Sequence, residues 1–235
     1  MAVSTDTIYQ TQVLAALFSP AFPIGAFSYS HGIEAAIASG DVVDASTAYD
    51  WIETILRGGS GRNDAILMAN AYKAVNLRAI KGADLTDSRN AEIEVINELA
   101  FALSPGAERA QESCELGINF TNIVNQVYGL DFGLSPPLAY PVAAGLAARH
   151  LGCELRLSLS FFLQSFIGNL ISVTLRAVPL GQSDGQIILA QLMPATAALA
   201  DEAATTTLDD VGGYAILADH ASILHETLET RIYRT

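Results

Sequence analysis

The chain has 235 residues, of which 51% are hydrophobic and only 16% are charged, so it contains enough apolar material for a folded core. Twelve basic residues against twenty-five acidic residues give a net charge of −13. This balance argues against nucleic-acid binding, because phosphate contact needs a positive surface, and it favours partners with basic surfaces. Two cysteines are too few for a disulfide framework, and the first residues lack the pattern of a secretory signal, so we expect a reduced, cytoplasmic setting.

Apolar residues recur mostly at helical spacing along the chain, whereas alternation at period two is scarce, which predicts an all-α fold. We expect helices at residues 8–18, 29–38, 61–77, 142–151, 153–177, 185–204 and 214–230. Apolar faces indicate three more helices: one between Asp44 and Gly58-Gly59, one that ends before Ser104-Pro105-Gly106, and one over residues 110–128.

No internal repeat, low-complexity tract or long linker divides the sequence, so we expect one domain over residues 1–235. The predicted architecture is a single-domain helical bundle of about ten helices, with short flexible ends at about residues 1–7 and 226–235. With 51% hydrophobic residues, some apolar surface should remain after one core is filled, and large patches are seldom left exposed. We therefore expect a dimer formed by helix packing.

Residues 157–175 raise the question of a membrane span, because they carry no charge over nineteen residues. Seven of them are polar, namely Ser158, Ser160, Gln164, Ser165, Asn169, Ser172 and Thr174. Several of these side chains fall on one stripe of a helix, which suits contact with another helix better than contact with lipid. We predict a buried central helix and no membrane association; the alternative, a membrane-associated protein, would sediment with membranes.

Motifs for covalent chemistry are largely missing from the sequence. No phosphate-binding loop of the Gly-x-x-x-x-Gly-Lys-[Ser/Thr] type occurs, and the glycine-rich residues 58–62 favour a helix-ending loop, so we expect no GTP or ATP hydrolysis by the chain itself. The alternative is a small helical hydrolase in which His31 activates Ser28 and is oriented by Glu34. Ser28 lacks the flanking glycines of a nucleophile elbow, and a triad is hard to build from neighbours on one helix. We therefore predict no catalytic residue.

The histidines and cysteines form no recognisable metal motif. His220 and His225 are five residues apart, so they do not share one face of a helix. His150 and Cys153 form an i, i+3 pair that could hold a soft metal ion, but a helix end beside a buried cysteine explains them better. We predict neither a tightly bound cofactor nor a high-affinity metal site.

A family resemblance is carried first by residues 17–34, which read Leu-Phe-Ser-Pro-Ala-Phe-Pro-Ile-Gly-Ala-Phe-Ser-Tyr-Ser-His-Gly-Ile-Glu. This segment resembles the N-terminal signature of the urease accessory F family, roughly S-P-x-[LF]-P-[VI]-G-[AG]-[FY]-S-[YW]-S-x-G-[LI]-E. Further stretches similar to the family follow in the expected order at residues 140–147, 163–172, 176–186 and 225–234. The resemblance covers about residues 8 to 235.

Three positions depart from the family pattern. Pro105 lies where the family usually has a Ser-Arg-Glu-Thr-like helix start, Ile118 stands where a basic residue is common, and His31 replaces a frequent glutamine. A partner contact made through those positions is therefore not expected to carry over unchanged.

The resemblance implies an all-helical, dimeric, non-catalytic protein that bridges the accessory protein called D (or H) and the nickel-binding GTPase called G. The complex would dock on apo-urease and help Ni²⁺ reach the active site together with carbon dioxide, which carbamylates a lysine of urease. Nickel would be handled transiently by the complex, and the F protein would modulate GTP-dependent assembly of the metal centre.

Two groups of polar residues in the conserved-looking stretches have open alternatives. Ser28, Tyr29 and Glu34 follow a turn rich in proline and glycine, and they suit either a partner-binding face or a structural role. Gln164 and Asn169 on the central helix are either satisfied buried amides or the lining of a polar path for a hydrated ion.

The C-terminal residues are predicted to serve partner docking rather than folding. Arg231, Tyr233 and Arg234 place two positive charges at the end of a strongly acidic chain, and Arg and Tyr are enriched at interface hot spots. The resemblance implies that this tail meets the D (or H) protein.

Overall fold

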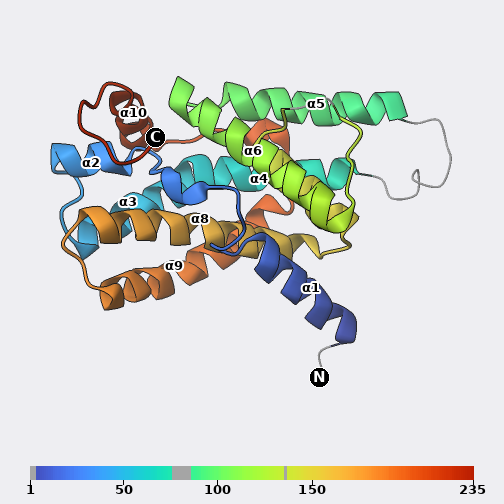
Figure 1. Cartoon of the computed structure of the whole chain (residues 1–235), viewed down its shortest axis with the longest axis horizontal. Coiled ribbons are helices and arrows are strands. Elements are labelled where there is room, and N and C mark those ends of the chain that lie inside the picture. Colours follow the sequence, from blue (N-terminus) through green and yellow to red (C-terminus); the bar gives the residue numbers. More distant parts are fainter. Residues whose placement is uncertain (1–3, 76–85, 135–136) are drawn as a thin grey trace.

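The computed structural model describes residues 4–75, 86–134 and 137–235, and these residues form helices joined by turns, without a strand. The α-helices are α1 (Thr5–Leu17), α2 (Ile33–Ser39), α3 (Ala45–Gly58), α4 (Ser60–Ala74), α5 (Thr86–Ala102), α6 (Ala107–Tyr128), α7 (Tyr140–His150), α8 (Leu155–Ala177), α9 (Gln182–Ala203) and α10 (Ile216–His225). Two short 3-10 helices, η1 (Ala26–Ser28) and η3 (Leu208–Asp210), complete the set. Figure 1 shows one packed body from which α1 extends at the N-terminal end. The predicted all-α, single-domain fold is confirmed.

The centre of the fold is α4, which packs against α3, α5, α7, α8 and α9. Its contact with α7 is close because the facing residues are small. A Cβ at Gly145 of α7 would lie 2.3 Å from the carbonyl oxygen of Met68 on α4. Helix α7 also packs against α6. A Cβ at Gly117 of α6 would lie 1.8 Å from the carbonyl oxygen of Leu138, just before α7. Glycine at these two positions therefore sets the spacing of α4, α7 and α6.

The long helix α8 is apolar and long enough to cross a membrane by length and composition alone. In the structure it packs against α9, α4, α3, α2 and α1, and 50% of its most apolar window is buried. Its polar residues Ser158 and Thr174 are buried and bond to backbone carbonyls of the same helix. This packing is that of a core helix, as the sequence predicts.

The break between α3 and α4 follows local sequence signals. Asp44 caps α3, because its side chain accepts the backbone N–H of Thr47 at 2.9 Å while the Thr47 hydroxyl accepts that of Asp44 at 3.0 Å. The helix ends at Gly58, where a Cβ would lie 2.4 Å from the ring of Tyr214. The loop predicted for residues 58–62 is shorter than expected, since α4 already begins at Ser60.

An aromatic cluster anchors the segment between α1 and α2. Phe18 stacks on Phe120 with ring centroids 6.5 Å apart and meets the edge of Phe162 at 5.9 Å. Phe22 and Tyr140 pack on the same Phe120 ring at 5.4 and 5.5 Å. The turn that carries the family signature is therefore fixed against α6, α7 and α8.

Several expected boundaries differ from the observed ones. Residues 29–32 are not helical, because His31 and Gly32 adopt left-handed φ values of 53° and 76°, and α2 begins only at Ile33. The first helix starts at Thr5 rather than at residue 8, so it takes in part of the expected flexible end 1–7. The helix expected at 61–77 ends at Ala74, and residues 76 and 77 lie outside the described part of the chain.

The C-terminal segment, residues 226–235, differs most from expectation. The helix expected at 214–230 ends at His225, and the chain then turns back across α2 and α6 (Figure 1). Tyr233 and Thr235 are buried, so this segment packs into the fold instead of forming a flexible end. Its contacts form the candidate site.

Candidate functional site

The site begins with the turn that leads into α2. Gly32 occupies a left-handed conformation, and a Cβ there would lie 2.6 Å from the backbone nitrogen of Ser222 on α10. Only glycine meets both conditions, the positive φ and the close approach to α10. The turn thus places residues 29–34 directly against α10 and the C-terminal segment.

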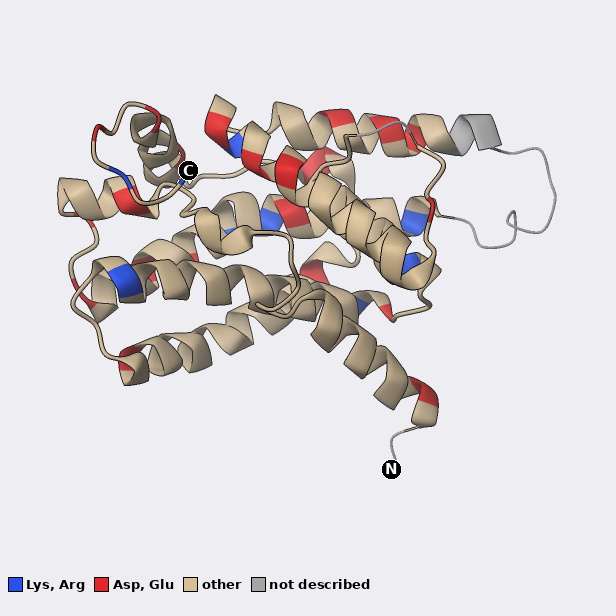
Figure 2. Ribbon diagram, viewed as in Figure 1, with Lys and Arg blue, Asp and Glu red and all other residues tan. Residues whose placement is uncertain are grey.

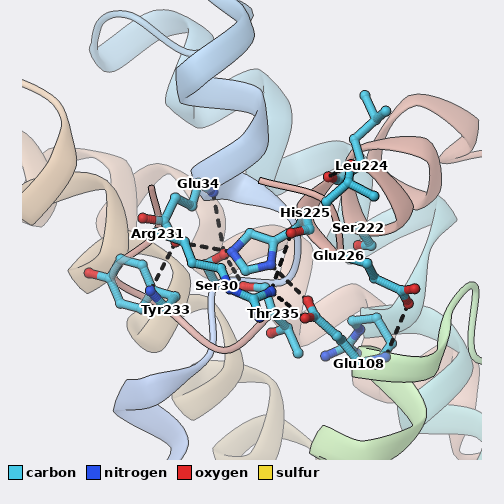
Figure 3. Close-up of polar contacts among 12 residues, drawn as sticks. Ser30, Glu34, Glu108, Ser222, Leu224, His225, Glu226, Arg231, Tyr233 and Thr235 are labelled. Atoms are coloured by element: carbon cyan, nitrogen blue, oxygen red, sulfur yellow. Dashed lines mark hydrogen bonds and ion pairs between the residues drawn. The ribbon is translucent and has the colours of Figure 1, made fainter. Parts of the chain in front are cut away.

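Glu34, in the first turn of α2, is the central acceptor of the site and is only 8% exposed. Its carboxylate accepts the backbone N–H of Ile232 at 2.6 Å and that of Tyr233 at 2.9 Å. Nε2 of His225 lies 3.0 Å from the same carboxylate (Figure 3). One side chain therefore joins α2, α10 and the C-terminal segment.

His225, the last residue of α10, lies between two carboxylates and is completely buried. While Nε2 faces Glu34, Nδ1 lies 2.8 Å from the carboxylate of Glu108 at the start of α6. The guanidinium of Arg231 also pairs with Glu108 (Figure 3). The backbone N–H of Glu108 donates in turn to the carboxylate of Glu226 at 3.2 Å.

The last two residues pair with the signature segment through the main chain. The N–H of Arg234 donates to the carbonyl of Ser28 at 2.8 Å, and the N–H of Ser30 donates to the carbonyl of Thr235 at 2.9 Å. The hydroxyl of Thr235 donates to Glu112 of α6 at 2.8 Å. These bonds hold residues 234 and 235 against the signature segment and α6.

A second ion pair lies beside this backbone pairing. The guanidinium of Arg234 donates two hydrogen bonds to Glu115 of α6, at 2.6 and 2.8 Å, and stacks over the ring of Tyr29 at 5.4 Å. The Tyr29 hydroxyl donates to Glu115 at 2.6 Å. The hydrogen bonds from Tyr29 and then Arg234 lower the pKa of Glu115 to about 2. Burial, followed by the contact with Glu115, raises the pKa of Tyr29.

A buried charge pair continues the site toward the core. Glu112 pairs with the Arg109 guanidinium and lies 2.8 Å from Nε2 of His31. Burial alone would raise the pKa of Glu112, but Arg109 and His31 outweigh it and lower this pKa to about 2. Burial, then the positive charge of Arg109, lowers the pKa of His31. Burial raises the pKa of the neighbouring Asp64 to about 7.

Gln164 and Asn169 of α8 both line a groove of about 750 Å³. The other wall of this groove is the segment from Leu17 to Phe27, and its floor includes Ser172 of α8. Asn169 also lines a smaller inner cavity with His31 and Asp64, and its amide donates to the carbonyl of Tyr29 at 3.1 Å. The two amides are thus half-buried at the surface of a continuous series of hollows.

The structure brings together all six residues that the sequence analysis assigns to partner binding. Tyr29, Glu34 and Tyr233 are buried within the cluster, whereas Arg231 and Arg234 keep exposed side chains. Ser28 contributes its carbonyl oxygen.

Sequence reasoning missed the partners of these residues on α6 and α10. Glu108, Glu112 and Glu115 recur at helical spacing on α6, and this spacing was the available signal for one acidic face. Figure 2 shows acidic residues, in red, on α6. For His225, the sequence analysis excludes a metal pair with His220 and places the residue in the stretch 225–234 that resembles the family.

The hydrolase alternative gains no support from the geometry. The ring of His31 bonds to Glu112 and Arg109, and the Glu34 carboxylate is used by His225 and the C-terminal backbone, so the proposed triad with Ser28 is not assembled. His31, one of the three positions that depart from the family pattern, therefore contacts residues inside the fold.

The pair of His150 and Cys153 also has local explanations. Nδ1 of His150 lies 2.8 Å from the carbonyl of Leu146, and burial raises the pKa of the Cys153 thiol to about 11. A thiolate, the form that binds metals, is thus disfavoured there.

Comparison with known proteins identifies the family of the chain. The sequence model of the family UreF matches residues 42–193. The chain is 40% identical over 233 residues to the urease accessory protein UreF of Ruegeria pomeroyi, covering 99% of this chain and 100% of that protein. It is 43% identical to UreF of Cereibacter sphaeroides (92% and 94% covered) and 42% identical to UreF of Bradyrhizobium diazoefficiens (92% and 88% covered). The chain belongs to the UreF family of urease accessory proteins.

Proposed function

We propose that this chain serves urease maturation in the cytoplasm as a non-catalytic adaptor, which joins the D (or H) accessory protein to the accessory GTPase G and docks with them on apo-urease. The observation that carries the proposal is the C-terminal segment, whose backbone is held while the side chains of Arg231, Ile232 and Arg234 stay exposed. Ile232 is 79% exposed, between an exposed Arg231 and the buried Tyr233. A segment already ordered loses little conformational entropy when a partner binds.

The neighbouring surface of α10 supports the same proposal. Large apolar side chains are exposed there, at Tyr214, Ile216, Leu217, Ile223 and Leu224. Interface cores are typically apolar with Arg and aromatic anchors, and exposed apolar surface beside such anchors is typical of a docking site. We assign this surface and the C-terminal segment to one partner interface.

The groove beside α8 supports a transient role in nickel transfer. Gln164 and Asn169 line it with amide oxygens, and the inner cavity that follows contains the carboxyls of Asp64 and Glu112. Oxygen donors of this kind suit a hydrated divalent ion that passes without tight binding. The isolated chain should accordingly bind Ni²⁺ with a Kd above the submicromolar range. Added salt should weaken that binding.

Co-expression with the D and G proteins and apo-urease tests the adaptor role. Wild-type chain should elute in a stable complex and support urease activation, whereas the Arg231→Ala, Arg234→Ala double variant should lose both. Arg57→Ala, whose exposed pair with Glu53 lies on α3, is the matched control and should behave as wild type. If the double variant still captures D within a few-fold of wild type, the proposed docking role of the segment is wrong.

We also propose that the chain is a homodimer, because apolar side chains such as Ile8, Tyr9 and Ile187 are exposed on helices α1 and α9. Light scattering at tens of micromolar should give twice the chain mass of 24.8 kDa. A mass of one chain under those conditions would contradict the dimer.

A further inference from the structure

Both ring nitrogens of His225 face carboxylates, and the ring has no contact with solvent. Nε2 lies 3.0 Å from Glu34 and Nδ1 lies 2.8 Å from Glu108. A neutral imidazole has one N–H donor and one lone pair, whereas the imidazolium has two N–H donors. Both contacts are therefore hydrogen bonds only when the ring carries two protons.

Two carboxylates and one nearby cation surround the ring. Glu34 faces it from α2 and Glu108 from α6, and the nearby cation, Arg231 of the C-terminal segment, pairs with Glu108. Glu226, the next residue in the chain, directs its carboxylate to the backbone N–H of Glu108. Farther along α6, Arg109 and Glu112 pair with each other and with His31 of the turn before α2.

Loss of one proton would leave a lone pair about 3 Å from a carboxylate, and one of the two acidic side chains would have to move. If Glu34 moves, the backbone N–H groups of Ile232 and Tyr233 lose their acceptor. If Glu108 moves, Arg231 loses its partner. Either movement removes a contact that holds the C-terminal segment.

We propose that His225 is a proton-dependent latch, which holds residues 231–233 against α2 and α6 when its ring is protonated and releases them when the ring is neutral. The contacts are complete at lower pH, and one is lost as pH rises. In strong acid the contacts are lost as well, because the carboxylates themselves are protonated. Histidine is the side chain whose charge ordinarily changes between about pH 5 and 8. That the latch controls partner docking rests on the proposed function; the release itself does not.

Amide hydrogen exchange on the full-length chain tests the latch. Protection factors of the Ile232 and Tyr233 amides, corrected for the intrinsic effect of pH on exchange, should fall about tenfold or more as the His225 ring loses its proton, equivalent to about 1.4 kcal/mol. In His225→Gln this pH dependence should disappear. His220→Gln, an exposed histidine on the same helix, is the matched control and should keep it.

Nitrogen-15 NMR of the His225 ring in the wild-type chain gives a measurement that needs no substitution, in case His225→Gln does not fold. Both ring nitrogens should be protonated where the amides are protected, and one should lose its proton as protection falls. Protection that is constant with pH, or that changes while the ring keeps one protonation state, would overturn the latch. Capture of the D protein is measured separately. If release of the segment depends on pH but capture does not, the latch is supported and the docking role is contradicted.

Discussion

Replacement of Glu34 with alanine should detach the C-terminal segment and destabilise the whole fold. The carboxylate receives three donors, from Ile232, Tyr233 and His225, and a hydrogen bond to a charged group contributes roughly 1.5–3 kcal/mol. The two backbone donors regain water when the segment detaches, whereas the buried His225 cannot. We therefore expect the free energy of unfolding to fall by about 3 kcal/mol, the lower end of the range for removing one partner of a buried ion pair.

Urea unfolding followed by circular dichroism measures this loss, and hydrogen exchange at Ile232 and Tyr233 reports the detachment directly. For a chain of this size the loss corresponds to a fall in Tm of roughly 6–12 °C. Glu53→Ala is the matched control, because its pair with Arg57 lies at the surface and should contribute at most about 0.5 kcal/mol. If the two variants lose the same small amount and both amides stay protected, Glu34 does not hold the segment.

Three further changes test other parts of the structure. Gly32→Ala should lower the free energy of unfolding, measured by urea titration, by about 3 kcal/mol, because Gly32 has a positive φ and lies in close contact with α10. The control Gly40→Ala should lower it by about 1 kcal/mol, because Gly40 has a positive φ but open space around it. Because burial raises the pKa of Asp64 to about 7, the folded chain holds a proton that the unfolded chain releases, so stability should fall as pH rises from about 4 to 7. Asp64→Asn should flatten that part of the curve of urea midpoint against pH. Arg234→Ala, at an exposed ion pair, should leave the circular dichroism unchanged but weaken capture of the D protein about thirtyfold, as expected for a hot-spot arginine; an unchanged Kd would contradict this.

Helices and their breaks could be predicted because their signals are local. Asp44 followed by Thr47 is an N-cap pattern, and the glycines at 58 and 59 end α3 where the sequence indicates. The boundary predicted at residues 29–33 was wrong for a reason that is not local. His31 adopts a positive φ that is unusual for a residue other than glycine, and only its tertiary contacts with α6 account for it.

The residues of the site could be predicted, but not their pairing. Glu34 and Arg231 stand out by residue type and by resemblance to the family, yet Glu34 bonds residues about two hundred positions away in the chain. No sequence pattern encodes such a contact without knowledge of the fold. The acidic residues of α6 look like a solvated helix face, but Glu112 is buried because the C-terminal segment, Arg109 and His31 cover it. The C-terminal segment was for the same reason expected to be flexible.

The close contact between α4 and α7 has a consequence for how the chain tolerates change. Alanine and glycine lose almost no side-chain entropy when they are buried, so this seam forms at low entropic cost, but it has no flexible side chain that could move aside. An added methyl group at Gly145 would push backbone against backbone, and α7 would shift as a rigid body. Because Gly117 fixes α6 against the start of α7, that shift would be passed to the helix whose acidic residues hold the C-terminal segment. The geometry of the proposed docking surface thus depends on the seam between α4 and α7, and sequence change in this seam is limited by the site as well as by the core.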